Sequence, residues 1–273
     1  MTMNSNNSTT LYLNLIKKTL MNQVYMNCEY QTIAAQHGWK GLITRYLSRR
    51  GFRLIRPRPG DAASRLAGKD VSPFAHTMIG QRRLDNVQWC AHQVIANQVP
   101  GDFIETGVWR GGTTIFMRAI LKAYEVKDRR VWVADSFEGL PAPDVEKYPL
   151  DAESLFHLRE DLSVSLEQVK ANFEAYGLLD EQVCFLEGWF RNTLPTASIQ
   201  KLSILRLDGD MYESTMDSLS NLYPKLSVGG YCIIDDYEIA MCRQAVHAYR
   251  DKYQITEEIV PIDSAGVYWQ RAK

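Results

Sequence analysis

The chain has 273 residues, and its 31 Lys and Arg against 32 Asp and Glu give a formal net charge of −1. Because positive and negative charges nearly cancel, the chain has no strong net electrostatic field that would attract a nucleic-acid backbone or a membrane surface. We expect neither as a partner. No apolar run reaches the roughly 20 residues that cross a bilayer, and the polar N-terminus lacks a signal-peptide core. The five cysteines are odd in number and widely spaced, which favours a reduced, cytoplasmic setting for a soluble protein.

The first 70 residues are predicted to be a partly helical N-terminal extension. Residues 1–10 are polar and are predicted to be disordered, whereas the apolar spacing from Leu11 to Val24 predicts an amphipathic helix. In residues 41–59 (GLITRYLSRRGFRLIRPRP) arginines alternate with apolar residues. We interpret this stretch as a solvated helix face followed by a proline-broken linker, rather than as a surface for an anionic partner. The extension is either a substrate cap or an element of a possible homo-oligomer.

Residues 71–273 show the alternation of an α/β domain. Short runs rich in β-branched and aromatic residues are separated by helix-length segments, which predicts a mostly parallel central sheet with helices on both faces. The predicted strands are residues 103–104, 131–134, 183–186, 202–207 and 231–234.

The turn after the first of these strands, FIETGVWRGGTT, carries an acid and three glycines into a helix. Glycine there allows a ligand to approach the backbone closely. Glu105 would repel a phosphate but suits a cation such as the α-ammonium of a methionine moiety, and Thr113 could bind the carboxylate of that moiety. An ordinary tight strand-to-helix turn is the alternative for this glycine pattern.

The second strand also ends in an acid, Asp135, about 30 residues after Glu105. In a doubly wound sheet both acids lie at the carboxyl edge, where a carboxylate can accept the hydroxyls of an adenosyl ribose. Asp135 as the cap of a following turn is the competing interpretation. Together, the two acids favour a cofactor site.

Two further strand ends are acidic: LRLDGD ends in Asp208, Gly209 and Asp210, and IIDD ends in Asp235 and Asp236. Carboxylates gathered at one sheet edge repel one another unless a cation lies among them, and an all-oxygen ligand set suggests Mg²⁺. The alternative assigns these acids to turns and helix caps.

The motifs ETGVWRGGT, ADSFEGLP, LRLDGDMYEST and IIDDY together resemble the macrocin O-methyltransferase family, which makes methylated deoxysugars of antibiotics, and in particular its members that methylate the noviose of novobiocin. The resemblance runs from about Met78 to the C-terminus. It implies a Rossmann-like methyltransferase fold, the cofactors S-adenosylmethionine and Mg²⁺, and a sugar-bearing small molecule as acceptor. By motif, the resemblance implies cofactor contacts at Thr77, Met78, Glu105, Gly107, Thr113, Asp135, Ser136, Gly188, Trp189 and Asp208. It implies metal ligands at Asp208, Asp235 and Asp236.

One position departs from the related catechol methyltransferases, in which a lysine three residues after the first metal ligand is the base. That position is Met211 here, so the resemblance assigns the base to Asp208. Residues 141–162 form a long polar insertion that we interpret as a substrate lid, with a solvent loop as the alternative. Arg82 is a further candidate contact to the acceptor.

Three other functions remain open at this point. The acceptor could be a phenol or catechol instead of a sugar. The Asp208-Gly209-Asp210 triplet could hold the metal and diphosphate of a nucleotide-sugar glycosyltransferase. As a third possibility, the chain could be a non-catalytic module that only binds a cofactor.

Overall fold

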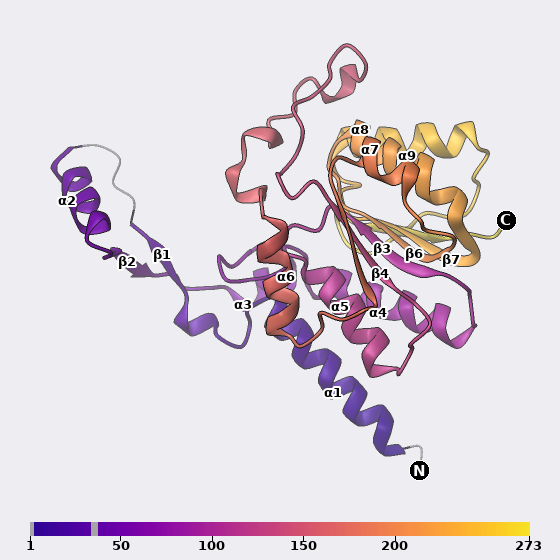
Figure 1. Ribbon diagram of the computed structural model, residues 1–273, viewed down its shortest axis with the longest axis horizontal. Coiled ribbons are helices and arrows are strands. Elements are labelled where there is room, and N and C mark those ends of the chain that lie inside the picture. Colours follow the sequence, from indigo (N-terminus) through magenta and orange to yellow (C-terminus); the bar gives the residue numbers. More distant parts are fainter. Residues whose placement is uncertain (1–2, 34–37) are drawn as a thin grey trace.

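The computed structural model describes residues 3–33 and 38–273, and a seven-stranded sheet forms its centre (Figure 1). The strand order is β5-β4-β3-β6-β7-β9-β8. The strands are β3 (Asp102–Thr106), β4 (Val131–Asp135), β5 (Val183–Glu187), β6 (Leu202–Leu207), β7 (Leu226–Ile234), β8 (Val260–Pro261) and β9 (Val267–Gln270). The first five are parallel, and β9 runs antiparallel to both its neighbours. This arrangement confirms the predicted mostly parallel α/β fold.

Helices cover both faces of the sheet (Figure 1). The first layer contains α1 (Met3–Leu20), α4 (Gln81–Ala96), α5 (Gly112–Ala123) and α6 (Leu166–Ala175), and the second contains α7 (Phe190–Thr193), α8 (Tyr212–Leu222) and α9 (Ala240–Lys252). Each layer encloses its own apolar cluster against the sheet.

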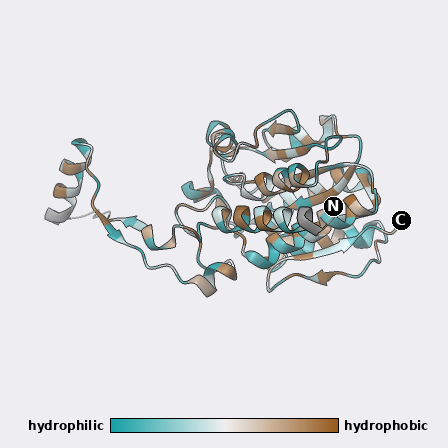
Figure 2. Ribbon diagram, turned by 90° about the horizontal axis from the view of Figure 1, so that it is seen from below, coloured by the Kyte–Doolittle hydropathy of each residue, from teal (hydrophilic) through white to brown (hydrophobic). Residues whose placement is uncertain are grey.

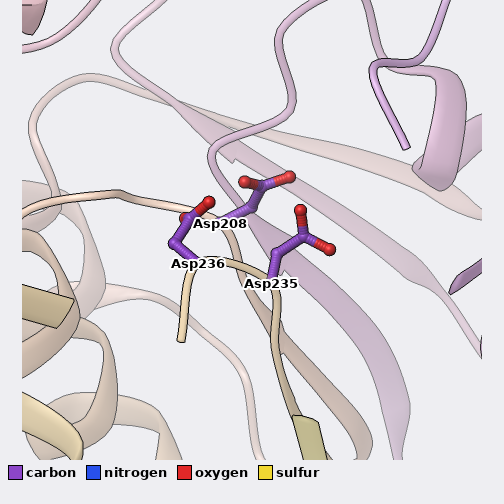
Figure 3. A group of neighbouring side chains, drawn as sticks. All are labelled: Asp208, Asp235 and Asp236. Carbon is purple, nitrogen blue, oxygen red and sulfur yellow. The ribbon is translucent and has the colours of Figure 1, made fainter. Parts of the chain in front are cut away.

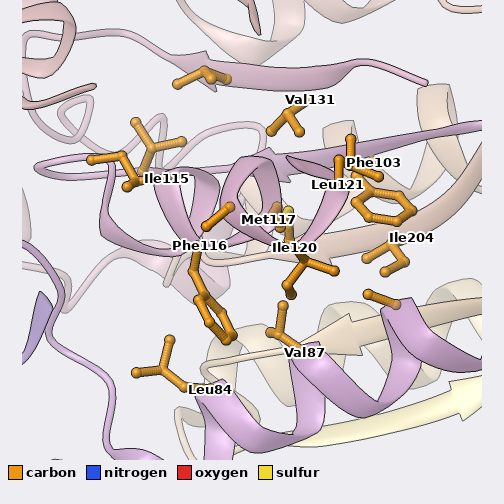
Figure 4. Close-up of a cluster of buried hydrophobic side chains, with 14 of the residues drawn as sticks. Leu84, Val87, Phe103, Ile115, Phe116, Met117, Ile120, Leu121, Val131 and Ile204 are labelled. Carbon is orange, nitrogen blue, oxygen red and sulfur yellow. The ribbon is translucent and has the colours of Figure 1, made fainter. Parts of the chain in front are cut away.

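Helix α5 is mostly apolar, and every residue from Gly112 to Leu121 is buried. Such a helix needs a partner on its outer side as well as the sheet on its inner side. Figure 4 shows this packing, with Phe116 directed towards Leu84 of α4. Because α5 begins at the glycine turn, this packing fixes that turn rigidly.

The N-terminal helix extends the first layer. Its face with Leu13, Ile16 and Leu20 is buried, and Lys17 pairs with Asp85 of α4 at 2.6 Å. The helix was expected from Leu11 but begins at Met3. The prediction of disorder is therefore wrong for residues 3–10, and residues 1–2 lie outside the described residues.

A segment that we call the arm (residues 30–58) projects away from the sheet (Figures 1 and 2). It consists of a hairpin of β1 (Tyr30–Thr32) and β2 (Ile55–Pro57) with α2 (Gly38–Arg49) between the strands. The helix predicted in the basic stretch is present, but the expected linker after it pairs as β2. The short helix α3 (Ala62–Leu66) then returns the chain to the sheet domain.

Short 3₁₀ turns complete the connections at Met26–Cys28, Pro149–Asp151, Phe156–Leu158, Glu160–Leu162, Leu194–Thr196 and Tyr223–Lys225. Within the described ranges, none of the helices combines the length and apolar character required to cross a membrane.

Candidate functional site

The four central strands end level with one another, and this register gathers the functional residues. Thr106 of β3 is paired with Ala134 of β4 and with Leu207 of β6, and Leu207 is paired with Ile234 of β7. The residues that come next along each strand are Gly107, Asp135, Asp208 and Asp235. They border a cavity of about 340 Å³ at the carboxyl edge of the sheet.

Most of the predicted site residues line this cavity. They are Thr77, Met78, Glu105, Gly107, Thr113, Asp135, Ser136, Trp189, Asp208, Asp235 and Asp236. Gly188 does not line it, although it adjoins Trp189. Arg82 is exposed on α4, and its neighbour Arg83 lines the cavity instead. Arg82 does not line the cavity because successive helix residues point about 100° apart, and its contact with the acceptor stays a prediction.

Gly107 lies where two loops touch. Its φ is +86°, and a Cβ atom on it would lie 1.7 Å from the carbonyl oxygen of Asp208. Only glycine fits such an approach. The sequence predicts that this glycine makes room for a ligand, which stays a prediction; the structure shows that it makes room for the Asp208 backbone.

Glu105 is 1% exposed, and its two carboxylate oxygens are in different situations. Oε1 pairs with Arg206, whereas Oε2 has no partner with full hydrogen-bond geometry in the described part of the chain; the Thr113 hydroxyl is near enough to the carboxyl to lower its pKa. Burial raises the pKa of Glu105 to about 8; Arg206 opposes this shift, and Asp208 and Asp235 add to it. A buried acceptor without a partner at the cavity fits a cationic ligand group such as an ammonium.

Asp135 has a structural role as well as a place at the cavity. Its Oδ2 accepts a hydrogen bond from the Val108 N–H at 2.7 Å, and its Oδ1 accepts one from the Phe137 N–H at 2.8 Å. Asp135 thus caps the turn, as the competing interpretation proposed, but these two bonds use only part of its capacity to accept hydrogen bonds. A carboxylate has about four lone-pair sites, so two remain for a ligand hydroxyl.

Asp208, Asp235 and Asp236 form a compact group (Figure 3). One oxygen of each lies within 4.8 Å of the others. Burial raises the pKa of Asp208 and of Asp236, and the neighbouring carboxylates raise both further. Three oxygen ligands with this mutual repulsion fit a hard divalent cation.

Arg206 of β6 was missed by the sequence analysis. It is fully buried and pairs with Glu105, with Asp208 at 2.8 Å and with Asp235. A guanidinium thus joins the acid of the glycine turn to two acids of the compact group. The signal in the sequence was a charged residue inside an otherwise apolar strand, which is rarely buried without a partner.

Arg83 is the second cation at this edge. Its guanidinium pairs with Asp235 at 2.6 Å and with Asp263 at 2.8 Å. Asp235 is therefore held from two sides, which fixes the orientation of its carboxylate.

Asp210 lies outside the three-carboxylate group but lines the same cavity. Its backbone is left-handed with φ +57°, and its N–H donates to Asp236 Oδ2 at 3.0 Å. Burial raises the pKa of Asp210 to about 7, with Asp208 and Asp235 adding to the shift. It is a second candidate for the base. Met211, at the position of the catechol enzymes' lysine, is buried and has no ionisable group.

The insertion (residues 141–162) supplies part of the cavity wall through Pro141, Phe156, Arg159 and Leu162. It is therefore not a simple solvent loop. The segment before α4 closes another side through Gly68 and Val71, which follow the arm in the chain.

Comparison with known proteins agrees with this geometry. The model of the macrocin-O-methyltransferase (TylF) family matches residues 9–271. The 8-demethyl-8-(2,3-dimethoxy-alpha-L-rhamnosyl)-tetracenomycin-C 4'-O-methyltransferase of Streptomyces olivaceus is 50% identical over 261 residues, which is 95% of this chain and 92% of that protein. The demethyldecarbamoylnovobiocin O-methyltransferase of Streptomyces niveus is 56% identical over 208 residues, 76% of this chain and 79% of that one. The solved structure of the O-methyltransferase NovP superposes with a TM-score of 0.83 at 47% identity, covering 97% of this chain and 100% of NovP.

Proposed function

The chain belongs to the macrocin O-methyltransferase family and is an O-methyltransferase, and from this premise we propose that it methylates a sugar hydroxyl of a glycosylated antibiotic intermediate, with S-adenosylmethionine as donor and Mg²⁺ at the three-carboxylate group. The observation that carries the proposal is the position of this group beside the unpartnered Oε2 of Glu105 in one cavity. The named activities of the two relatives support a glycoside acceptor. The glycosyltransferase and non-catalytic alternatives are overturned by the family assignment.

The proposed donor site uses the glycine turn. Glu105 Oε2 would accept from the methionine ammonium, and Thr113 at the start of α5 would meet its carboxylate. Asp135 and Ser136 would take the ribose, and Trp189 would cover the adenine with Gly188 beside it. Thr77 and Met78 line the same cavity, and the carbonyl of His76 and the Thr77 side chain pack directly on Gly112 at the start of α5.

The proposed metal ligands are Asp208, Asp235 and Asp236. When bound, Mg²⁺ would hold the acceptor hydroxyl and lower its pKa, and S-adenosylmethionine would supply the methyl group. Arg206, Arg83 and Arg159 face a larger number of acidic groups at this edge, namely Glu105, Asp208, Asp210, Asp235 and Asp236, and the burial and crowding of these acids raise the pKa of several of them. This excess of negative charge favours a further cation.

The residues of the chain would then align the acceptor and take its proton. We retain Asp208 as the proposed base, since it follows β6 directly and borders the cavity. The Asp208 carboxylate also forms an ion pair with Arg206 at 2.8 Å. Asp210 has no such ion pair in the described residues and is the competing candidate. Alignment of the acceptor hydroxyl with the donor methyl group would contribute much of the rate.

The test is release of S-adenosylhomocysteine with a panel of glycosides and phenols, with and without EDTA. We expect turnover with a glycoside that stops on chelation and returns with Mg²⁺. Turnover that survives exhaustive chelation would disprove the role of the metal. A preference for phenols would show that the acceptor is a phenol and not a sugar.

Substitutions distinguish the ligands from the base. Asp235→Ala or Asp236→Ala should lose metal affinity, and activity should partly return at high Mg²⁺. Asp208→Asn should slow turnover at least roughly 100-fold without such rescue, because an amide cannot take a proton. If Asp208→Asn remains fast while Asp210→Asn is slow, the base is Asp210.

A reducing, cytoplasmic location is part of the proposal. It is consistent with the five cysteines, all of which are free thiols.

A further inference from the structure

Within the insertion, Asp151 is an exception. Its neighbour Leu150 is 46% exposed and Leu155 is 66% exposed, whereas Asp151 is fully buried. A buried carboxylate is costly unless its oxygens are hydrogen-bonded. The contacts of Asp151 therefore show what holds the insertion.

Both oxygens of Asp151 bond to the beginning of α8. Oδ1 accepts from the Tyr212 N–H at 2.7 Å, and Oδ2 accepts from the Glu213 N–H at 3.0 Å. These are two of the backbone donors that a helix leaves unpaired at its N-terminus, where the helix dipole also favours negative charge. Met211, the N-cap residue of α8, provides no side-chain acceptor. Asp151 thus caps the N-terminus of α8 from 61 residues away, a role that a local Ser, Thr or Asp usually has.

The start of α8 is close to the proposed chemistry. Only residues 208–211 separate the end of β6 from α8, and two of these four are the proposed ligand and base Asp208 and the competing base Asp210. The loop is confined on its other side by Gly107, which contacts the Asp208 carbonyl. A shift of the first turn of α8 must therefore move these carboxylates.

The insertion has a second attachment that is independent of Asp151. The indole N–H of Trp109, in the glycine turn, donates to the Asp161 carbonyl oxygen at 2.8 Å. Loss of the Asp151 bonds would leave this contact with the proposed donor site in place. The two attachments are thus separable by substitution.

We propose that Asp151 is a positioning residue that fixes the first turn of α8 and, through it, the geometry of the loop with Asp208 and Asp210. The inference rests on the proposed function for its catalytic consequence. Its structural part concerns only the N–H groups of Tyr212 and Glu213, and this part is measurable on the protein alone.

The experiment compares Asp151→Ala, Asp151→Asn and the matched control Asp144→Asn. Asp144 is an exposed acid of the same insertion, and its carboxylate accepts from the Lys147 N–H within the insertion. The measurements are kcat, the Mg²⁺ concentration for half-maximal rate, S-adenosylhomocysteine affinity by calorimetry, and amide hydrogen exchange at residues 212–213.

For Asp151→Ala we expect kcat to fall about 10- to 100-fold, the usual range for a group that orients ligand-bearing residues, with a higher Mg²⁺ requirement. Affinity for S-adenosylhomocysteine should stay within about twofold, and exchange at residues 212–213 should accelerate. Asp151→Asn keeps one acceptor oxygen and should be intermediate. Asp144→Asn should resemble the wild type throughout.

Wild-type kcat and Mg²⁺ requirement in folded Asp151→Ala would overturn the proposal, as would unchanged exchange at residues 212–213. If Asp151→Ala does not fold, Asp151→Asn decides by the same criteria. If the wild-type protein methylates no glycoside or phenol, the proposed function fails, and the exchange data alone then decide whether Asp151 holds α8.

Discussion

The arm (residues 30–58) and the insertion (residues 141–162) are both additions to the sheet domain, but they are attached differently. The insertion bonds at two separate points, through Asp151 to α8 and through Asp161 to the glycine turn, and its side chains line the cavity. Among its described residues the arm is attached at its base, and Leu42, Tyr46 and Phe52 near its tip are 64%, 58% and 65% exposed. Being an addition to the sheet domain therefore does not by itself make a segment part of the site. The bonds to α8 and to the glycine turn, at the carboxyl edge of the sheet, bring the insertion into the site.

The base of the arm is a buried ion cluster. Glu29 is 3% exposed and pairs with Arg65, which is 2% exposed, and with Arg58 at 2.8 Å. Arg65 also pairs with Asp70 at 2.8 Å. Gly68 and Val71 of the cavity wall lie in the same stretch, so this cluster joins the arm to one side of the site.

The largest effect on stability is expected from a substitution in this ion cluster. Glu29→Gln leaves Arg65 buried without its main partner and should lower the free energy of unfolding by roughly 3–5 kcal/mol, measured by chemical denaturation. Asp161→Asn is the control, because its partner Arg159 and Asp161 itself have side chains 53% and 64% exposed, and such pairs contribute about 0–1 kcal/mol. Equal losses for both variants would show that the arm is not held at its base.

The same cluster predicts a pH dependence. Burial alone would raise the pKa of Glu29, but hydrogen bonds from Arg65, Ser72 and Asn22 outweigh it and lower the pKa to about 2. A carboxylate with a depressed pKa stabilises the fold above its unfolded pKa of about 4.5, and that stability is lost as the pH falls towards 2. Thermal unfolding between pH 5 and pH 2.5 should show this loss in the wild type. Glu29→Gln should show a flatter profile.

An intermediate effect is expected when a short Gly/Ser loop replaces residues 141–162. Acceptor KM should rise at least about tenfold, because cavity wall and the α8 bonds are both lost, whereas donor affinity should fall by only about 0.5–1.5 kcal/mol for the lost Trp109 bond. Steady-state kinetics and calorimetry measure the two separately. Complete loss of donor binding would mean that the insertion also forms the donor site.

The smallest effect is expected at the arm tip. Leu42→Ser with Tyr46→Ser should change the free energy of unfolding by less than about 0.5 kcal/mol, since both side chains are exposed in one chain. Light scattering alongside denaturation tests the oligomerisation role considered for the N-terminal extension. A fall in molar mass with a clear loss of stability would show that a second copy covers the tip.

The sequence predicts the elements that have strong local patterns. The five parallel strands were found from their apolar runs, and their register accounts for the convergence of Asp208, Asp235 and Asp236. The start of β7 at Leu226 was missed because Gly229 and Gly230 interrupt its apolar pattern. The hairpin of β8 and β9 was also missed, since the β8 segment is only two residues long.

The residues that sequence reasoning missed at the site depend on distant partners. Arg206 looks like an isolated charge in β6 until Glu105, about 100 residues away, is placed beside it. Asp151 looks like any loop acid, although the non-capping Met211 before α8 was a signal that a distant acceptor was needed. Such pairings are set by tertiary structure, which local periodicity does not encode.

The contact between Gly107 and the Asp208 carbonyl has a consequence for redesign. If the donor site were redesigned for donors with larger alkyl groups, small residues near the donor would be obvious positions to vary. Position 107 offers no such freedom, because even a methyl group there would overlap the backbone that carries the acids of the other loop. Space for a longer alkyl chain has to come from side chains that can be shortened, such as Leu140 and Phe156, which also line the cavity.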